Sequence, residues 1–401
     1  MSEVTISPAP EAHAPPGGLR VVQINDAFDQ ALTDPVALLD GYSTLTGWSE
    51  ALVAAGAGKV TVVQRFGRHA SLTRSGIEYI FCAETRDLHR MAVRALPDIV
   101  HVNGLVFSGR AWRLRRLLPA RTAIVVQDHA SRAPDAGGAS LWRLLQRTAR
   151  RRAMRTADGF LFSAAEQADA WRRAGLIGAA QRIYEVMEAS TTLRAMPRAA
   201  ARQSSGVDGS PAVLWVGRLN ANKDPLTILD GFERGLAQVP DAVLTMIYST
   251  ADLLPAVRER VRASAALQRH VRLVGRVPHT LMPAFYGAAD LFVLGSHHEG
   301  SGYALLEALA CGVAPVVTNI PTFRVMTAGG SLGALWTPGD AHGFARALAE
   351  VAGRDAAGWR ARIADHFERA LSWSAVGSSA MRVYQDAVTR RRASAGGRFV
   401  R

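Results

Sequence analysis

The sequence is short of cysteine and of long apolar stretches. Its two cysteines among 401 residues, Cys82 and Cys311, each lie inside an apolar run, which argues against a disulfide framework or a cysteine-based metal site and favours a reducing cytoplasm. No stretch reaches the ~20 uninterrupted apolar residues of a membrane span. The first residues are rich in Pro and Ala without an apolar centre, so we expect 1–18 to be a disordered leader and not a signal peptide.

Lysine is nearly absent as well, although the chain is strongly basic. Only two of its 47 basic residues are lysines, Lys59 and Lys223, and the net charge is +13. Where composition favours arginine so strongly, a retained lysine indicates a position at which a mobile point charge serves better than a planar guanidinium. This indication draws attention to Lys223.

Short apolar runs alternate with amphipathic stretches along most of the chain, which predicts parallel sheets with helices on both faces. Small, polar and basic residues interrupt the alternation at 196–210, which we interpret as a linker. We therefore expect domains at 19–195 and 211–373, a final helix at 374–392 that crosses back to the first domain, and a basic tail at 393–401. Two doubly wound domains bind ligands at the carboxyl ends of their strands, here in a cleft between the domains.

A Gly-rich turn opens a predicted helix in the second domain. Gly300, Ser301 and Gly302 precede that helix, so several backbone N–H groups converge on one place and suit a phosphate. Glu299 in the turn and Glu307 inside the helix bracket this place. Because a carboxylate repels a phosphate, we expect both to accept hydrogen bonds from sugar or ribose hydroxyls. The alternative is a loop acid and a solvated helix residue.

The sequence GRLNANKDP, at 217–225, carries two cations. A predicted strand ends at Gly217, and Arg218 and Lys223 lie in the loop before the next helix. Opposite the Gly-rich turn they would form a clamp for a diphosphate. A leaving diphosphate gains negative charge as its bond breaks, so such a clamp stabilises the transition state more than the ground state. The alternative is two surface cations.

Together, GRLNANKDPLTIL (217–229) and EGSGYALLEALACGVAPVVT (299–318) resemble the retaining glycosyltransferases of family 4, within glycosyl transferases group 1. The resemblance is strong over about 213–373 and weaker before it. It implies the α/β GT-B fold, two Rossmann-like domains facing across a cleft. It also implies a retaining enzyme that moves a sugar from a nucleotide diphosphate sugar to an acceptor hydroxyl, by same-face attack and without a metal. No Asp-x-Asp motif is present.

The resemblance assigns roles to single residues. It implies that Arg218 and Lys223 hold the donor's diphosphate, while Glu299 contacts the donor sugar and Glu307 the ribose. The other donor-site residues that it implies are Gly217, Gly300 and Ser301, the backbone N–H groups of Gly302, Tyr303 and Ala304, and Val277 in a loop near the nucleobase.

The N-terminal half is expected to hold the acceptor. His129 follows a predicted strand, where family members place a histidine beside the reacting sugar; a plain loop histidine is the alternative. The family's Gly-Gly turn after the first strand is not evident, and Gly41-Tyr42 or Gly47-Trp48 is the candidate to replace it. Asn103-Gly104 ends another strand and is expected to line the cleft.

The expected partners follow from the same resemblance. We expect a UDP- or GDP-sugar as co-substrate, no cofactor, and a glycan, glycolipid or small molecule as acceptor. The stretches 110–118 and 141–155 interleave Trp and Leu with Arg, as in helices that lie on anionic membranes. Docking on the inner face of the plasma membrane and an arginine-biased solvated face both stay open. No nucleic-acid-binding module is recognisable, and we expect a cytoplasmic protein.

Two other functions stay open. A catalytically degenerate nucleotide-sugar-binding protein is favoured by the missing Gly-Gly turn. A GT-B nucleotide-sugar epimerase would convert the donor with no acceptor present.

Overall fold

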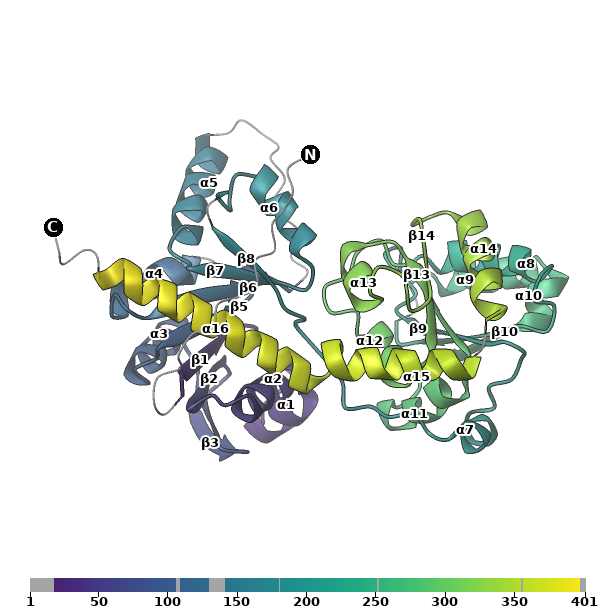
Figure 1. The fold of residues 1–401 in the computed structure, drawn as a ribbon, viewed down its shortest axis with the longest axis horizontal. Helices are drawn as coiled ribbons and strands as arrows, with labels where there is room; N and C mark the ends of the chain where they lie inside the picture. The colour runs from purple at the N-terminus through teal and green to yellow at the C-terminus, as the bar shows by residue number, and fades with distance from the viewer. Residues whose placement is uncertain are drawn as a thin grey trace. The chain divides into compact units, whose positions relative to one another are not determined.

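The computed structural model describes residues 18–105, 109–129, 141–179, 181–250, 252–354 and 356–396. Apart from Gly18, the expected leader lies outside the described residues, as does the end of the expected tail, 397–401. The chain divides into two compact α/β units (Figure 1). One comprises the residues up to Ala189 and those from Trp373 onward, and the other comprises Ser190–Ser372.

The first unit is built on an eight-stranded sheet with the order β3-β4-β2-β1-β5-β6-β7-β8. Its strands are β1 (Arg20–Asn25), β2 (Lys59–Arg65), β3 (Ala70–Arg74), β4 (Ile77–Cys82), β5 (Ile99–Asn103), β6 (Ala123–Gln127), β7 (Gly159–Phe162) and β8 (Arg182–Glu185). All pair in parallel except β3, which pairs antiparallel with β4 at the edge. The predicted parallel sheet is confirmed, with this exception.

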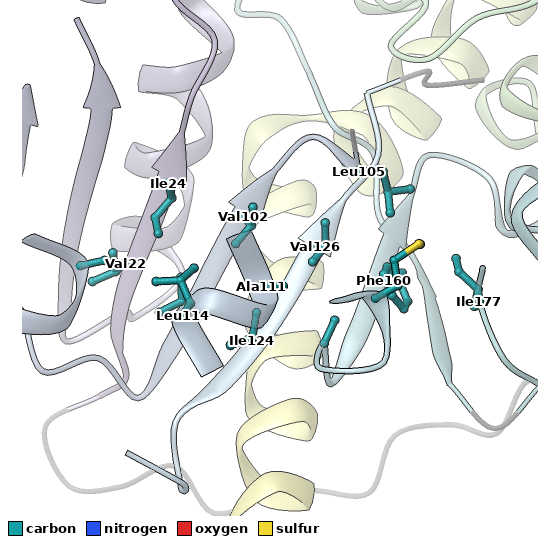
Figure 2. Packing of buried hydrophobic residues seen from close by; sticks show 14 of the residues in the cluster. Val22, Ile24, Val102, Leu105, Ala111, Leu114, Ile124, Val126, Phe160 and Ile177 are labelled. Atoms are coloured by element: carbon teal, nitrogen blue, oxygen red, sulfur yellow. The ribbon is translucent and has the colours of Figure 1, made fainter. Parts of the chain in front are cut away.

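Helices cover both faces of this sheet. They are α1 (Pro35–Gly41), α2 (Ser43–Ala54), α3 (Thr85–Arg94), α4 (Gly109–Leu117), α5 (Leu141–Met154), α6 (Ala168–Arg173) and α16 (Trp373–Gly396), with a 3-10 turn, η2 (Ala165–Gln167). Figure 2 shows how side chains of neighbouring strands, such as Ile24, Val102 and Val126, pack into one apolar layer with Leu114 of α4. Strands buried on both faces must be apolar at nearly every position, which explains runs such as AIVVQ.

The long helix α16 packs on the first unit, against α2 and the strands β5 and β6. Met381, Tyr384 and Val388 are buried, so one face of this helix contributes to the apolar core of the unit. Gly377 allows the close approach: a Cβ there would lie 2.3 Å from the carbonyl oxygen of Ala51 in α2.

The second unit is built on a six-stranded parallel sheet with the order β11-β10-β9-β12-β13-β14. Its strands are β9 (Ala212–Gly217), β10 (Val243–Tyr248), β11 (Val271–Gly275), β12 (Leu291–Leu294), β13 (Ala314–Thr318) and β14 (Ala334–Trp336). Its helices are α7 (Arg198–Ser205), α8 (Pro225–Gly235), α9 (Leu254–Arg262), α10 (Ala265–His270), α11 (Met282–Ala288), α12 (Tyr303–Ala310), α13 (Pro321–Met326), α14 (Ala341–Ala352) and α15 (Ala356–His366), with the short turns η3 (His279–Leu281) and η4 (Phe367–Leu371).

The stretch predicted as a linker, 196–210, carries structure instead. Helix α7 lies within it and belongs to the second unit. Ala201 is buried against α11, and Arg198 and Arg202 both pair with the carboxylate of Asp290. The small and basic residues that indicated a linker are therefore packing and ion-pairing residues, and the boundary between the units falls earlier, at Ala189 and Ser190.

Candidate functional site

The chain order of the second sheet reverses between β9 and β12. From β9 the chain adds β10 and β11 on one side, and β12, β13 and β14 then follow on the other. At such a switch point the loops after the two neighbouring strands diverge and leave a crevice at the carboxyl ends. Here the loop 218–224 follows β9 and the loop 295–302 follows β12. These loops contain the two sequence motifs.

Hydrogen bonds to backbone carbonyl groups hold these two loops together. The side-chain amide of Asn222 donates to the carbonyl oxygen of His298 at 2.9 Å, and the N–H of His297 donates to the carbonyl of Asn222 at 2.9 Å. Gly295 permits this approach, because a Cβ there would lie 3.1 Å from the carbonyl of Asp224. Asp224 itself caps α8 and accepts from the N–H of Thr227.

The structure brings Lys223 and Glu299 into direct contact. Lys223 Nζ pairs with Glu299 Oε1, and the two side chains are only 15% and 12% exposed. Thr322 holds the same loop by donating to the carbonyl of Glu299 at 2.8 Å. Arg218 is exposed, and no ion pair joins it to another residue in the described ranges. The site thus combines a paired lysine with an exposed arginine.

Helix α12 begins immediately after the Gly-rich turn. Gly302 is its N-cap, with φ of +59°, a conformation that glycine adopts without strain. A side chain there would also press on Met326 and Phe323, both 3.2 Å from a Cβ. Gly300 and Ser301 lie in the turn, and Tyr303 and Ala304 form the first turn of the helix. The N–H groups of a first turn point out of the helix and carry its positive dipole end.

Two side chains hold the carboxylate of Glu307. His279 Nε2 lies 2.6 Å from Oε1, and the hydroxyl of Tyr286 donates to Oε2 at 2.9 Å. Burial and the Glu307 carboxylate raise the pKa of Tyr286 well above its usual value, so it remains a hydrogen-bond donor. His279 belongs to η3, which follows the loop with Val277. That loop therefore reaches Glu307 through His279, although no contact of Val277 itself with the carboxylate is seen among the described residues.

The first sheet reverses in the same way between β1 and β5. A cavity of about 320 Å³ opens at the carboxyl ends of these strands. It is lined by Gln23, Asn25, Asp26, Ala27, Asp29, Leu38, Tyr42, Thr44, Leu45, Trp48, Gln64, Asn103, Gly104, Gln127, His129 and Glu188. His129, Asn103 and Gly104, all singled out from the sequence, thus share one cavity. Tyr42 and Trp48 line it too, whereas Gly47 packs against Trp373.

His129 is held by a buried carboxylate. Its Nδ1 lies 2.6 Å from Glu188 Oε2, and its Nε2 lies 3.1 Å from Asn103 Oδ1. Glu188 is 3% exposed and follows β8. Burial alone would lower the pKa of His129, but the hydrogen bond and charge of Glu188, aided by Asp128, outweigh burial and raise it. His129 is therefore an imidazole held at both ring nitrogens, and its expected place beside the reacting sugar stays a prediction.

A buried polar cluster of His101, Tyr384 and Trp48 adjoins the cavity, and Trp48 is part of the cavity wall. His101 of β5 contacts the hydroxyl of Tyr384 in α16 through Nδ1 at 2.6 Å. Trp48 donates its indole N–H to the same hydroxyl at 3.3 Å. Burial, with the nearby charge of His129, lowers the pKa of His101 to about 3, so it is neutral. Helix α16 thus fixes the position of a cavity wall.

Sequence reasoning missed residues of both sites, among them Glu188, His279 and Tyr286. Glu188 follows a strand, RIYE, that was not recognised because the run is short and only partly buried. Tyr286 lies in the largely apolar segment MPAFYGA and His279 in a short turn, so neither position carries a local signal. A polar residue just past a strand end was the signal available for Glu188.

In the described part of the chain, neither a metal cluster nor a membrane span is found. Within the described residues, no group of three or more His, Cys, Asp or Glu side chains is placed to hold a metal ion. Metal independence stays a prediction. In the same part of the chain no helix is both long and apolar enough to cross a bilayer.

The comparison with known families bears on the second unit. Residues 197–356 match the family model described as Glycosyl transferases group 1. The match spans both loops of the β9–β12 crevice, so the group 1 resemblance noted in the sequence is supported there. Membership of family 4 stays a prediction.

Curated relatives match parts of the chain. Mannosylfructose-phosphate synthase of Agrobacterium fabrum is 37% identical over 124 residues, which are 29% of this chain and 27% of that protein. Phosphatidyl-myo-inositol mannosyltransferase of Mycolicibacterium smegmatis is 31% identical over 190 residues, 45% of this chain and 47% of that protein. The chain thus spans less than half the length of either relative.

A solved structure matches nearly the whole chain. The Anabaena protein HepE, in complex with UDP, has a TM-score of 0.57 at 14% identity, covering 95% of this chain and 99% of that chain. At this identity the likeness shows the fold. Together with the two parallel α/β sheets it confirms the predicted GT-B fold class.

Proposed function

We propose that this protein is a retaining, metal-independent glycosyltransferase that moves a sugar from a nucleotide diphosphate sugar to an acceptor hydroxyl. One observation carries the proposal. Lys223, Glu299 and the N-terminus of α12 meet at the β9–β12 switch point, inside the segment that matches the group 1 family. This combination offers cations and a helix dipole to a diphosphate and a carboxylate to a sugar.

The chemistry of donor cleavage fits this arrangement. As the bond between the anomeric carbon and the diphosphate oxygen breaks, negative charge grows on the diphosphate. Arg218, Lys223 and the first turn of α12 stabilise that charge without a metal. Glu299 accepts hydrogen bonds from the sugar, which requires that its pairing with Lys223 loosen or be shared. Attack by the acceptor on the same face, with its proton passing to the departing phosphate, retains the anomeric configuration.

The nucleotide is proposed to bind through Glu307. Its carboxylate is held by Tyr286 and His279, and a ribose diol can donate to the same oxygens. HepE is solved with UDP, and this motivates UDP as the first nucleotide to test here, with GDP as the alternative. The acceptor is proposed to enter the cavity of the first unit that contains His129.

The first test is thermal stabilisation by UDP, GDP, ADP and dTDP. A ligand at 100 times its dissociation constant adds roughly 2.7 kcal/mol to the stability. We expect one base to stabilise the wild type and to lose most of this effect in Glu307→Ala. In that variant Tyr286 keeps its bond to the carbonyl of Ala304 at 3.2 Å, so the fold should persist. Glu259→Ala, an exposed glutamate on α9, is the matched control.

The outcomes separate the alternatives. No stabilisation by any nucleotide in the wild type would refute the donor site. Binding without release of nucleoside diphosphate from UDP- or GDP-sugars, for any acceptor, would favour a degenerate binding protein. Conversion of the donor sugar with no acceptor present would favour an epimerase. Retention is checked by NMR of the anomeric proton of the product.

Peripheral association with an anionic membrane is proposed as an accompanying property. Trp112 and Leu117 of α4 are 45% and 50% exposed, and Leu145 of α5 is 55% exposed. Two arginines of this region are held by partners within the fold: Arg115 pairs with Asp158, and Arg147 donates to the carbonyl of Ala174. Co-sedimentation with anionic but not neutral liposomes, weakened in Trp112→Ala, is the expected result. Equal sedimentation with both would contradict it.

A further inference from the structure

The cavity of the first unit has an unusual balance of polar groups. Three of its lining side chains are carboxylates, Asp26, Asp29 and Glu188. Of the described residues that line it, none is lysine or arginine. The other polar groups are the amides of Gln23, Asn25, Gln64, Asn103 and Gln127, together with Tyr42, Thr44, Trp48 and His129.

Two cations beside the cavity pair with its carboxylates. Arg110 pairs with Asp26, whose side chain is 7% exposed. His129 pairs with the buried Glu188. The third carboxylate, Asp29, is exposed and accepts from the hydroxyl of Tyr42 at 3.3 Å and from the N–H of Ala31 at 2.9 Å. Among the described residues, an anion entering this cavity therefore meets at least as much negative as positive charge.

The amides and carboxylates instead suit hydroxyl groups. Asn103 donates to Asn25 and offers its carbonyl oxygen to His129, while Gln64 donates to the carbonyls of Ala27 and Arg65 at 2.7 and 2.8 Å. Such groups held in place by their own partners can both donate to and accept from a ring of hydroxyls. Trp48 and Leu45 supply apolar wall, as in small-molecule sites in general.

We propose that this cavity binds an uncharged polyhydroxyl acceptor, a free sugar or cyclitol ring, and rejects a ring that carries a phosphate ester. The inference rests on the proposed transfer function for its biological sense, but it concerns a binding preference that can be measured without turnover. Like-charge repulsion in a partly desolvated cavity acts against the ester, whereas the hydroxyls of a neutral ring find partners.

The test compares matched pairs of probes on the full chain in the presence of UDP. The pairs are D-glucose and glucose 6-phosphate, D-mannose and mannose 6-phosphate, and myo-inositol and inositol 1-phosphate. Binding is followed by saturation-transfer NMR with competition. We expect at least one neutral ring to bind, and to bind ~10-fold or more tightly than its phosphate. Raising the salt concentration to about 1 M shortens the screening length to ~3 Å and should narrow this ratio.

A substitution at the cavity rim sharpens the test. Asp29→Asn removes an exposed charge without disturbing the buried pairs. It should improve binding of the phosphate ester and so bring the affinities of the neutral ring and its ester closer together. Asp169→Asn, which removes an exposed carboxylate of α6, should leave the ratio unchanged. Asp26→Asn gives a second, less exposed variant with the same expected direction, because it removes the carboxylate that pairs with Arg110 while the arginine keeps its charge.

Several results would overturn the proposal. A phosphate ester that binds as tightly as its neutral ring, or an unchanged ratio in both cavity variants, would show that the carboxylates do not select. Binding of no probe would show that the cavity takes no acceptor of this size. The nucleotide stabilisation of the wild type is measured in the same samples, so its loss identifies a failure of the proposed function and its presence assigns the failure to the cavity.

Discussion

The two sheets share a topology and differ in the chemistry at their switch points. In both, the chain reverses direction across the sheet beside its first strand, and polar side chains gather at the carboxyl ends. At the β9–β12 point they are Arg218, the Lys223–Glu299 pair and the N-terminus of α12. At the β1–β5 point they are mainly carboxylates and amides.

This difference shows where specificity resides in such folds. The strands of both sheets are apolar because helices cover both faces, so they can carry little chemical information. The loops that follow the strands are free to vary. A Gly-rich turn followed by a helix makes one crevice suitable for phosphates, whereas loops bearing Asp26, Asp29 and Glu188 make the other suitable for hydroxyls. The following predictions test this contrast.

The largest expected effect follows removal of the paired lysine. Lys223→Ala should reduce kcat by ~10²-fold or more, the scale of losing one preorganised stabilising group. The only other lysine, Lys59, provides a matched control, because it forms an exposed pair with Glu78 in the first unit and Lys59→Ala should leave kcat unchanged. Equal turnover in the Lys223 variant and the wild type would remove this residue from the mechanism.

A smaller effect is expected from the helix that supports the acceptor cavity. Tyr384→Phe deletes the hydroxyl that contacts His101 and Trp48 and leaves fully buried polar atoms without their partner. Such a loss costs about 1–3 kcal/mol, to be measured as the free energy of unfolding in urea. Tyr248→Phe in β10, where burial is partial, is the control. If nucleotide stabilisation of the Tyr384 variant also collapsed, the two switch points would not be independent.

The smallest effect concerns protonation of His129. Its pKa is raised in the folded protein because the Glu188 pair outweighs burial. The pair therefore contributes stability in full below the unfolded value of about 6.5, and that contribution is lost as the pH rises through the raised folded pKa. The difference in free energy of unfolding between the wild type and Glu188→Gln should therefore become smaller as the pH rises above about 6.5.

The same variant should shift a kinetic inflection. If His129 acts protonated, the pH at which kcat/KM falls should move down in Glu188→Gln, because the imidazole loses the carboxylate that raises its pKa. The NMR titration of the His129 ring gives the pKa directly. An unchanged titration in the variant would show that Glu188 is merely a packing residue.

Much of the fold was predictable because its signals are local. Alternating apolar runs indicated parallel α/β sheets. Arg218 and Lys223 were expected in a loop before a helix, which the structure confirms, since α8 begins at Pro225. Edge strands were harder: β3 is mostly exposed and β8 only partly buried, so neither carries the apolar run that marks a central strand. The segment of helix α7 was interpreted as a linker because its own residues carry no apolar run. Its alanine and arginine residues are held by neighbours distant in the sequence, such as Asp290, which a local pattern does not reveal.

The candidate sites divide along the same line. The positions of the Gly-rich turn, the cation-bearing loop and the two glutamates could be read from short stretches, because glycine conformation and helix capping depend on a few adjacent residues. Which of these residues meet depends on the folding of the whole unit. Lys223 and Glu299 are 76 residues apart, and His101 and Tyr384 are 283 apart. Strand order and the return of α16 bring them together, and both depend on burying apolar surface across the whole unit and not on any local pattern.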